Sequence, residues 1–367
     1  MTCTAAGALL TVDLGALAAN YRHLSERLGS AQCGAVVKAD GYGLGAATIA
    51  PALFGAGCRH FFVAHLEEGV ALRRSVPAQA AISVMHGVFA GGEADCVAHD
   101  LVPVCNSPAQ LARWKQQAHV VGRRLPVILQ IDTGMARFGF APAELDSVGD
   151  DLAGLTLQYV MSHLACADTP EHPANTEQRV RFDTSRARLP PAPATFAASS
   201  GIFLGPEFHY DLARPGAALY GVAPIAGASN PMRSVVRLDA KVVQLRSVPA
   251  GTPVGYGHTV RTPVPARLAT VAVGYADGYL RSGSNHGSAW LGDIALPVMG
   301  RVSMDSIVLD ASAAPEGALH EGSMVELIGP HRGVDAVAAD AGTIGYEILT
   351  SLGRRYHRSY ISEDPRG

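Results

Sequence analysis

The sequence predicts an α/β protein in which a TIM-type (β/α)8 barrel is followed by a mainly β C-terminal domain. Two observations support this prediction. From residue 34 to residue 214, eight short apolar runs alternate with segments of helical spacing, at roughly 25 residues per unit. After residue 234, strand-like runs follow one another without long helical segments between them. We place the barrel at residues 1–228 and the β domain at residues 229–367, divided at the AGASNP stretch.

The expected elements begin with a short strand at 9–13 and a helix at 14–29. The barrel strands are then expected at 34–38, 61–64, 81–85, 101–105, 126–132, 157–163, 194–199 and 209–214. Short runs rich in small and β-branched residues are typical of parallel strands that are buried on both faces. A barrel needs helical connections between such strands, and the spacing between the runs provides them.

The second domain is expected to be built from antiparallel strands. Alternating or apolar runs, separated by turn residues, lie at 235–248, 267–278, 288–310 and 324–329. Helical spacing returns only at 335–353. This succession of strands predicts a mainly β domain with helical segments near its end.

Polar residues stand at the ends of nearly all the expected barrel strands. Functional groups of a TIM barrel lie at the carboxyl ends of its strands. These ends are Lys38, His65, His86, Asn106, Asp132 with Arg137 beyond it, His163, Ser199 and Arg214. We interpret His65, His86 and Asn106 as ordinary strand ends that face solvent, and the others as candidates for a site.

Lys38 is the most informative of these residues. It ends the apolar strand of GAVVKADGYGLGA, and only three of the 29 basic residues are lysine. The other two, Lys115 and Lys241, fit the polar face of a helix and the outer face of a strand. An amine, unlike a guanidinium, can lose its proton and form a Schiff base with an aldehyde cofactor. Lys38 is therefore the candidate for that chemistry.

A dinucleotide-binding site is an alternative interpretation of the same stretch. Gly41, Gly43 and Ala46 fit the pattern G-x-G-x-x-A, and Glu67 and Glu68 follow at the roughly 20-residue distance of a ribose-binding acid. The charged Lys-Ala-Asp step, however, occupies the place of the tight turn, and 40 glycines in the chain make a chance match common. A nicotinamide cofactor is therefore less strongly indicated than an aldehyde cofactor bound to Lys38.

Composition limits the classes of partner. The 367 residues are 48% hydrophobic and carry a net charge of −3, so neither nucleic acid nor an anionic membrane is an expected partner. The six cysteines (3, 33, 58, 96, 105 and 166) contain no C-x-x-C pair, which favours reduced thiols over disulfides or a metal site. The first 21 residues contain no lysine or arginine, so no signal peptide is expected. We expect a cytoplasmic protein that acts on small molecules.

Nine motifs together carry a resemblance to a known family. They are VVKADGYGLG, IDTGMARFG, SHLACAD, ASSGIFLG, ARPGAALYG, VGYGHT, VGYADGY, GRVSMD and IGYE. In this order the chain resembles the bacterial alanine racemase family over nearly its whole length. The resemblance implies a barrel that binds pyridoxal 5′-phosphate, and a site that is completed by the β domain of a partner subunit in a homodimer.

Racemisation explains why the family needs such residues. The cofactor makes removal of the Cα proton feasible by delocalising the resulting charge, and inversion then requires one base on each face of the substrate. The resemblance implies that Lys38 is the cofactor anchor and one base, and that Tyr256 of the second subunit is the other. His163 and Arg214 match the residues that support the tyrosine, with Arg214 against the pyridine nitrogen. From the residues alone, Tyr256 would be an ordinary turn aromatic between two glycines.

The resemblance also implies roles for further residues. The matched positions are Tyr42, Ser199, Tyr346 and the backbone amides of Gly216 and Ala217 for the cofactor phosphate, Arg137 and Met304 for the substrate carboxylate, and Tyr275 and Asp305 for the entrance. For Asp305, the pattern is nearly as well explained by an acidic turn residue that faces solvent and has no role at the entrance.

The implied reaction is the interconversion of L- and D-alanine, supplying D-alanine for peptidoglycan. A serine or broad-specificity racemase is an alternative, because a methylene in a pocket contributes only about 1–3 kcal/mol to selectivity. A barrel that carries the cofactor without racemase activity is a second alternative, although it would not need Tyr256. A decarboxylase with the same cofactor is a more distant one.

One position departs from the family pattern. Many members carry a carbamylated lysine two residues before the Asp-Thr-Gly-Met run, and its negative charge orients the arginine matched by Arg137. Here the position is Gln130, which cannot form a carbamate. Either the amide of Gln130 contacts Arg137 directly, or a small anion such as chloride replaces the charge. We predict the anion, since a neutral acceptor alone leaves a guanidinium uncompensated.

Overall fold

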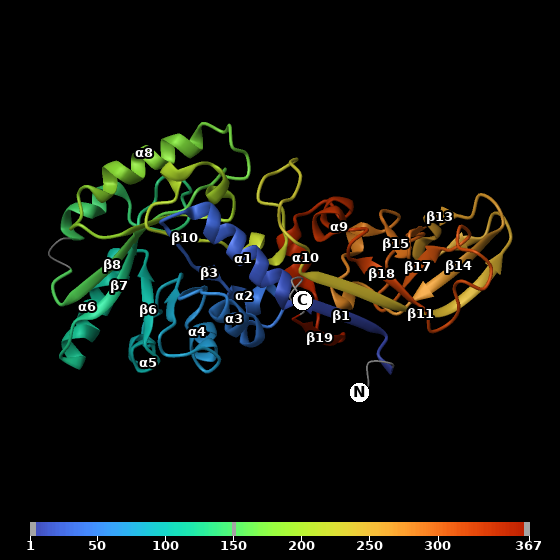
Figure 1. The fold of residues 1–367 in the computed structure, drawn as a ribbon, viewed down its shortest axis with the longest axis horizontal. Helices are drawn as coiled ribbons and strands as arrows, with labels where there is room; N and C mark the ends of the chain where they lie inside the picture. The colour runs from blue at the N-terminus through green and yellow to red at the C-terminus, as the bar shows by residue number, and fades with distance from the viewer. Residues whose placement is uncertain (1–4, 149–151, 363–367) are drawn as a thin grey trace. The chain divides into compact units, whose positions relative to one another are not determined.

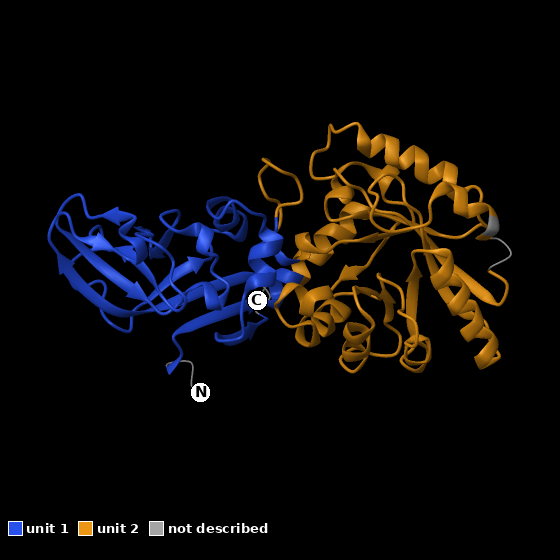
Figure 2. Cartoon of the chain, turned by 180° about the vertical axis from the view of Figure 1, so that it is seen from behind, with its two compact units in different colours: residues 1–17, 220–222, 233–367 blue, residues 18–219, 223–232 orange. Residues whose placement is uncertain are grey.

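The computed structural model describes residues 5–148 and 152–362, which form two compact units. The barrel unit comprises residues 18–219 and 223–232, and the β unit comprises the described residues of 1–17, 220–222 and 233–367 (Figure 2).

The barrel unit contains one parallel sheet that carries all eight predicted barrel strands (Figure 1). Its strands run in the order β2-β10-β9-β8-β7-β6-β5-β4-β3. Their bounds are β2 Gln32–Cys33, β3 Ala35–Val36, β4 His60–Val63, β5 Ala81–Val84, β6 Leu101–Cys105, β7 Leu125–Gln130, β8 Leu155–Met161, β9 Ala194–Ala198 and β10 Leu212–Arg214. The TIM-type barrel is therefore confirmed.

The first predicted barrel strand closes the barrel. Gly34, where that predicted strand begins, separates β3, which pairs with β4, from the preceding β2, which pairs with β10. The prediction ended the strand at Lys38, but β3 ends at Val36 and Lys38 begins the turn that follows. The amide of Gly34 donates to the carbonyl of Ala213 at 2.9 Å. A Cβ atom on Gly34 would lie only 3.1 Å from the carbonyl oxygen of His60, so both neighbouring strands approach its backbone closely. The strand that leads to Lys38 thus joins the first and last strands of the sheet.

Helices connect the barrel strands as the periodicity predicts. They are α1 Leu14–Leu28, α3 Ala46–Gly55, α4 Leu66–Arg73, α5 Glu93–Ala98, α6 Pro108–Val121 and α8 Ala174–Arg186. Helix α6 shows the local signals clearly, because the hydroxyl of Ser107 accepts the amide of Gln110 and Gly122 ends the helix with φ 66°. The buried rings of Phe182 and Phe196 stack at 4.9 Å between centroids, which packs α8 against β9.

The β unit is organised around one long strand, β11. Its strands are β1 Ala8–Asp13, β11 Val236–Val248, β12 Pro253–Val254, β13 Val260–Arg261, β14 Ala266–Val271, β15 Ser288–Leu291, β16 Ile294–Pro297, β17 Ile307–Asp310, β18 Met324–Ile328 and β19 His357–Ile361, and its later helices are α9 Val334–Asp340 and α10 Gly345–Ser351. Strand β11 pairs with β1, β14 and β18, all antiparallel. The mainly β second domain is thus confirmed.

The domain assignment of the N-terminal strand needs correction. The prediction put residues 1–228 in the barrel, but β1 lies in the β unit, antiparallel to β11 and parallel to β19. Leu10 and Val12 are fully buried there. Residues 220–222 also belong to the β unit, whose main segment begins at Arg233. Alternation of apolar residues identifies a strand, but it does not identify the strand with which it pairs. Strand β19 was not predicted, because its residues HRSYI show little apolar pattern.

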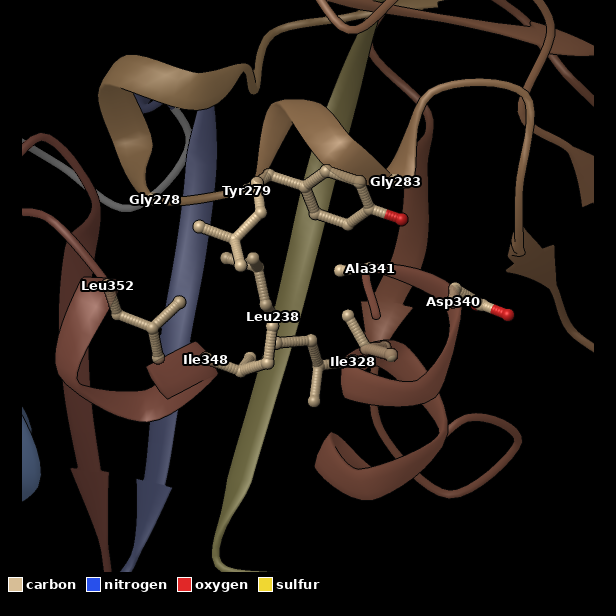
Figure 3. Close-up of a pocket in the computed structure, with 11 residues that line it drawn as sticks. Leu238, Gly278, Tyr279, Gly283, Ile328, Asp340, Ala341, Ile348 and Leu352 are labelled. Carbon is tan, nitrogen blue, oxygen red and sulfur yellow. The ribbon is translucent and has the colours of Figure 1, made fainter. Parts of the chain in front are cut away.

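The β unit encloses an apolar pocket between β11, α9 and α10. Figure 3 shows Leu238, Tyr279 and Ile348 around it, with Asp340 at one side. No predicted site residue lines this pocket. The predicted site residues lie instead at the strand ends of the barrel and in the loops and the α10 start of the β unit.

Among the described residues, no helix is both long and apolar enough to cross a membrane. Within the same part of the chain, no three His, Cys, Asp or Glu side chains are grouped as they would be around a metal ion. Cys33, Cys58, Cys96, Cys105 and Cys166 are free thiols, and Cys3 lies outside the described residues.

Candidate active site

The predicted site residues fall into two groups, one in each unit. The barrel group is Lys38, Tyr42, Arg137, His163, Ser199, Arg214, Gly216 and Ala217, and the β group is Tyr256, Tyr275, Met304, Asp305 and Tyr346. In the barrel group, Lys38, Arg137, His163 and Arg214 come from four different strand ends. His163 interacts electrostatically with the other three, and Lys38 also interacts with Arg137. The strand-end rule therefore identified groups that the fold brings together.

Lys38 opens an unusual backbone turn, α2 (Lys38–Tyr42). Residues 39 to 42 all have positive φ, at 53°, 54°, 65° and 56°. For a residue with a Cβ, this left-handed conformation costs about 1–2 kcal/mol. The amides of Gly43 and Gly45 stabilise the turn by donating to the carbonyls of Ala39 and Asp40, each at 2.7 Å. Strain of this kind is typical of functional sites, where the surrounding structure maintains it.

The environment of Lys38 favours its neutral amine. The side chain is half-buried, and burial lowers its pKa, as does the positive charge of Arg137, while Glu68 acts in the opposite direction. A lowered pKa makes more of the amine available as a nucleophile or base at neutral pH.

Arg214 is a buried cation at the end of β10. It is only 2% exposed and donates to the hydroxyl of Thr195 at 2.5 Å and to the carbonyl of Ser162 at 2.7 Å. These acceptors are neutral oxygen atoms. Burial lowers the pKa of Arg214 to about 9, which leaves it protonated at neutral pH. The site therefore contains a fixed positive charge.

His163 is neutral in this setting. Burial lowers its pKa to about 3, together with the positive charges of Arg214, Arg137 and Lys38. A neutral imidazole has one N–H donor and one acceptor nitrogen. The backbone carbonyl of His163 accepts the side-chain amide of Gln178 at 3.0 Å, and this bond holds the segment after β8 in place.

The ends of β9 and β10 bring a hydroxyl and several backbone amides together in a cradle. The hydroxyl of Ser199 accepts the amides of Gly216 at 2.9 Å and Ala218 at 3.2 Å. A Cβ atom on Gly216 would lie 2.2 Å from the hydroxyl oxygen of Tyr42, so only glycine allows that phenol to approach the cradle. Hydroxyls and converging backbone amides suit a phosphate group, and these residues fit the cofactor that the resemblance implies. Ala217 lies between the two amides, and Ala218 was not predicted.

Arg137 is carried by a loop that Asp132 shapes. One carboxylate oxygen of Asp132 accepts the amides of residues 134, 135 and 136 at 2.9, 3.0 and 3.2 Å. Ala136 is left-handed, with φ 55°, and the Arg137 side chain that follows is exposed. The position is suited to a ligand carboxylate that arrives from solvent.

Gln130 is buried at the end of β7, and its side-chain amide donates to the carbonyl of Phe138 at 3.5 Å. In the described part of the chain, no hydrogen bond joins Gln130 to Arg137. The direct contact is thus not formed here, and the bound anion stays a prediction.

The β group is exposed. Tyr256 begins a single turn, η6 (Tyr256–His258), at the tip of the β12–β13 hairpin, and it is 71% exposed. The glycines on either side, Gly255 and Gly257, have φ 67° and 73° and permit the tight loop. Met304 is 53% exposed, and its carbonyl accepts the amide of Ala276 at 3.0 Å. Tyr346 lies at the start of α10 and is partly exposed.

One arginine joins the two loops that carry the predicted entrance residues. Arg355 donates to both carboxylate oxygens of Asp277 at 2.6 and 2.8 Å and to Asp305 at 2.7 Å. Asp277 is buried, and it also accepts the amide of Gly274 at 2.9 Å, just before Tyr275. Sequence reasoning missed Arg355 and Asp277, although Asp277 lies within the VGYADGY motif.

His86 also requires a correction. It was interpreted as a solvent-facing strand end, but its ring lies 4.6 Å from that of His65 and 5.1 Å from that of Phe138. Burial lowers its pKa, as do His65 and Lys38. His86 therefore belongs to the surroundings of Lys38. Asn106 has a local structural role, since its side-chain amide donates to two backbone carbonyls at 2.9 Å.

The chain is similar to known proteins over nearly its whole length. Family models described as "Alanine racemase, N-terminal domain" and "Alanine racemase, C-terminal domain" match residues 12–224 and 235–360. A protein of Mesorhizobium japonicum named "Alanine racemase, catabolic" is 55% identical over 97% of this chain and 94% of its own. One of the same name from Agrobacterium fabrum is 52% identical over 96% and 92%. The structure of a Bartonella henselae alanine racemase "with covalently bound pyridoxal phosphate" is 41% identical, with a TM-score of 0.93, over 97% of this chain and 100% of its own.

Proposed function

The chain belongs to the alanine racemase family, and from this premise we propose that it interconverts L- and D-alanine with pyridoxal 5′-phosphate. The observation that supports the proposal most strongly is the barrel group. One strand-end surface combines an amine of lowered pKa, a buried guanidinium and a cradle of hydroxyls and amides. These are the groups that an aldehyde, a pyridine nitrogen and a phosphate require.

Pyridoxal phosphate, when bound, delocalises the negative charge that remains on Cα after proton removal. Ser199, Tyr42 and the backbone amides of Gly216 and Ala217 would hold its phosphate. Arg214 would face the ring nitrogen, and because arginine stays protonated it would keep that nitrogen unprotonated. A less electron-poor ring shortens the life of the charged carbon, which favours reprotonation over side reactions.

Lys38 would have two roles, covalent anchor and base. Burial and Arg137 lower its pKa, so that Nζ can take a proton from one face of Cα or return one to it. The left-handed turn that begins at Ala39 sets the direction in which the lysine leaves the sheet.

Tyr256 of a second copy would act on the opposite face. Its exposure at a hairpin tip makes its hydroxyl accessible to another chain. An unperturbed tyrosine titrates near pH 10, so a working phenolate needs donors and positive charge close by. Neutral His163 would supply an N–H donor, and Arg214 the charge. This assignment implies a homodimer with shared sites.

The substrate is placed by its carboxylate. Arg137 and the backbone of Met304 would receive it, with Tyr275 and Asp305 at the entrance. A serine or broad-specificity racemase would use the same contacts, because only the side-chain pocket differs. Coupling the reaction to a D-amino acid oxidase over a panel of L-amino acids separates these cases, and comparable rates with alanine and serine would contradict alanine specificity.

The physiological role has two candidates. Supply of D-alanine for peptidoglycan is the first, and it fits a cytoplasmic enzyme. The names of the Mesorhizobium and Agrobacterium relatives favour a second role, in catabolism. Deletion of the gene discriminates between them: a need for added D-alanine supports the first role, and lost growth on alanine as nitrogen source supports the second.

The direct test is Lys38→Ala. We expect the visible absorbance of the lysine-bound cofactor to disappear and racemisation to fall by at least about 10⁴-fold in both directions, the upper range for a positioned acid–base group. Lys115→Ala, on the surface of α6, is the matched control and should retain both. Borohydride reduction followed by peptide mapping should label Lys38. If Lys38→Ala keeps the absorbance and the activity, another lysine binds the cofactor.

A further inference from the structure

One carboxylate connects the turn of Lys38 to the neighbouring strand. Glu68, in the first turn of α4, accepts the amide of Ala39 at 2.6 Å through Oε1. Through Oε2 it accepts the amides of Ala64 at 2.7 Å and His65 at 3.1 Å. The same side chain therefore binds the peptide directly after Lys38 and the end of β4.

An ordinary helix cap does not require this arrangement. A glutamate in the first helical turn commonly bonds to the amide of its own N-cap residue, which here is His65. The bond to Ala39 reaches 29 residues back in the chain, to the first residue of the left-handed turn. Hydrogen bonds to an ionised carboxylate are about twice as strong as neutral ones. Glu68 thus stabilises a strained conformation that local propensity disfavours.

We propose that Glu68 is a positioning residue for Lys38: it holds the Lys38–Ala39 peptide in the left-handed turn and so directs the amine at the strand end. The inference rests on the proposed function of Lys38. It also accounts for an acid that sequence reasoning had considered for a ribose, because both oxygens of this carboxylate are occupied by backbone amides.

The charge of Glu68 gives the proposal a second measurable consequence. Three basic groups interact with Lys38 or share its surroundings: Arg137, His163 and His86. The carboxylate of Glu68 raises the pKa of Lys38, against the effects of burial and of Arg137. Removing this negative charge should lower the pKa of the amine further.

The test compares Glu68→Gln with Glu67→Gln. Both substitutions remove one carboxylate from the first turn of α4, so they share the loss of favourable charge at the helix N-terminus. Only Glu68 bonds to Ala39. Three quantities are measured: hydrogen exchange of the segment around Ala39 in the apoenzyme, the pH dependence of Lys38 reaction with an amine reagent in the apoenzyme, and kcat and KM of the holoenzyme.

For Glu68→Gln we expect faster exchange around Ala39 and a lower Lys38 pKa. We also expect kcat to fall by about 10- to 100-fold with little change in KM, as a misplaced catalytic group would cause. Glu67→Gln should match the unmodified enzyme in all three. If Glu68→Gln folds and also matches it, the proposal is wrong.

Glu68→Asp separates position from charge, and it replaces Glu68→Gln if that variant does not fold. It keeps the negative charge but shortens the reach to Ala39. We expect faster exchange and lower kcat, with the Lys38 pKa close to that of the unmodified enzyme. Unchanged exchange and kcat would overturn the proposal. Failure of the proposed function would look different, since Lys38→Ala would then retain cofactor absorbance.

Discussion

The barrel group and the β group differ in how their residues are held. Arg214 is 2% exposed and is fixed by hydrogen bonds to its own barrel, whereas Tyr256 is 71% exposed at a hairpin tip. A buried group is oriented by its neighbours before any ligand arrives. For an exposed aromatic side chain at a hairpin tip, the backbone fixes where the residue lies but no neighbouring side chains fix the direction of the ring. We therefore expect the barrel group to be preorganised for the cofactor, and the β group to act on a molecule outside its own surface.

The contrast extends to the polar contacts. In the barrel, Ser199 and Glu68 bind backbone amides close to the candidate cofactor site. In the β unit, Arg355 holds Asp277 and Asp305 while remaining about half exposed. Salt screens exposed pairs more than buried ones. We therefore expect the arrangement of the β group to respond more strongly to ionic strength than the barrel group does.

Tyr256→Phe gives the sharpest test of the contrast. The variant should bind the cofactor and fold normally, because an exposed side chain contributes within about 0.5 kcal/mol to stability. Racemisation should fall by about 10²- to 10⁴-fold, the usual effect of a positioned acid–base group. Turnover in each direction, together with deuterium uptake from solvent, measures this. Undiminished turnover both ways would remove Tyr256 from the mechanism.

Mixing subunits shows whether the two groups come from different chains. Inactive Lys38→Ala and inactive Tyr256→Phe subunits should recover part of the activity after exchange, since one site of each heterodimer would be intact. Either variant exchanged with itself is the control. No recovery after verified exchange would contradict a shared site.

Gly216→Ala tests the packing of the barrel group. The added Cβ would lie 2.2 Å from the Tyr42 hydroxyl, and relieving such overpacking typically costs about 1–3 kcal/mol. We expect weaker binding of the cofactor, measured by its dissociation on dialysis, and a lower unfolding temperature. Gly55→Ala is the matched control, because no atom lies within 4 Å of a Cβ there. Equal cofactor affinity in both variants would show that the cradle is not preorganised.

His163 should make the stability of the barrel depend on pH. Its folded-state pKa of about 3 lies below the value of about 6.5 expected for the unfolded chain. Below pH 6.5 the unfolded chain binds a proton that the folded protein does not. The free energy of unfolding should therefore fall by about 1.4 kcal/mol per pH unit from this residue as the pH drops toward 3. Denaturant titration of the apoenzyme should show a shallower fall in His163→Gln, and equal slopes would contradict a histidine that stays neutral in the folded protein.

The smallest expected effect concerns Gln130 and the exposed Arg137. Activity at low ionic strength should rise with chloride by up to about fivefold, since exposed charge pairs contribute about 0.2–1 kcal/mol. Sulfate at matched ionic strength is the control, and bicarbonate should have no effect. Activation by bicarbonate would contradict the prediction. An anomalous-scattering peak from soaked bromide beside Gln130 would locate the anion.

Much of the fold was predictable because it is local. The eight barrel runs, the helices between them and the β strands from residue 235 follow from periodicity, which a chain carries in every short window. Lys38, Ser199, Arg137, His163 and Arg214 were identifiable because a barrel gathers its strand ends at one face. The β group depended on the family resemblance, since an exposed tyrosine between glycines has no local mark of function.

Which distant segments meet depends on how the elements pack, and short stretches of sequence do not reveal it. Strand β1 makes its backbone hydrogen bonds with β11 and β19 in the β unit, although nothing in its own sequence distinguishes it from a barrel strand. Three further groups could not be predicted because each bonds to a partner far away in sequence. They are the carboxylate of Glu68, the amide of Ala218 and the guanidinium of Arg355. Hydrophobic periodicity specifies an element and its buried face, but hydrogen-bond partners are chosen by how the elements pack. Periodicity was enough to predict most elements and to single out Lys38, whereas the packing of those elements provides the hydrogen bonds that hold the Lys38 turn in place.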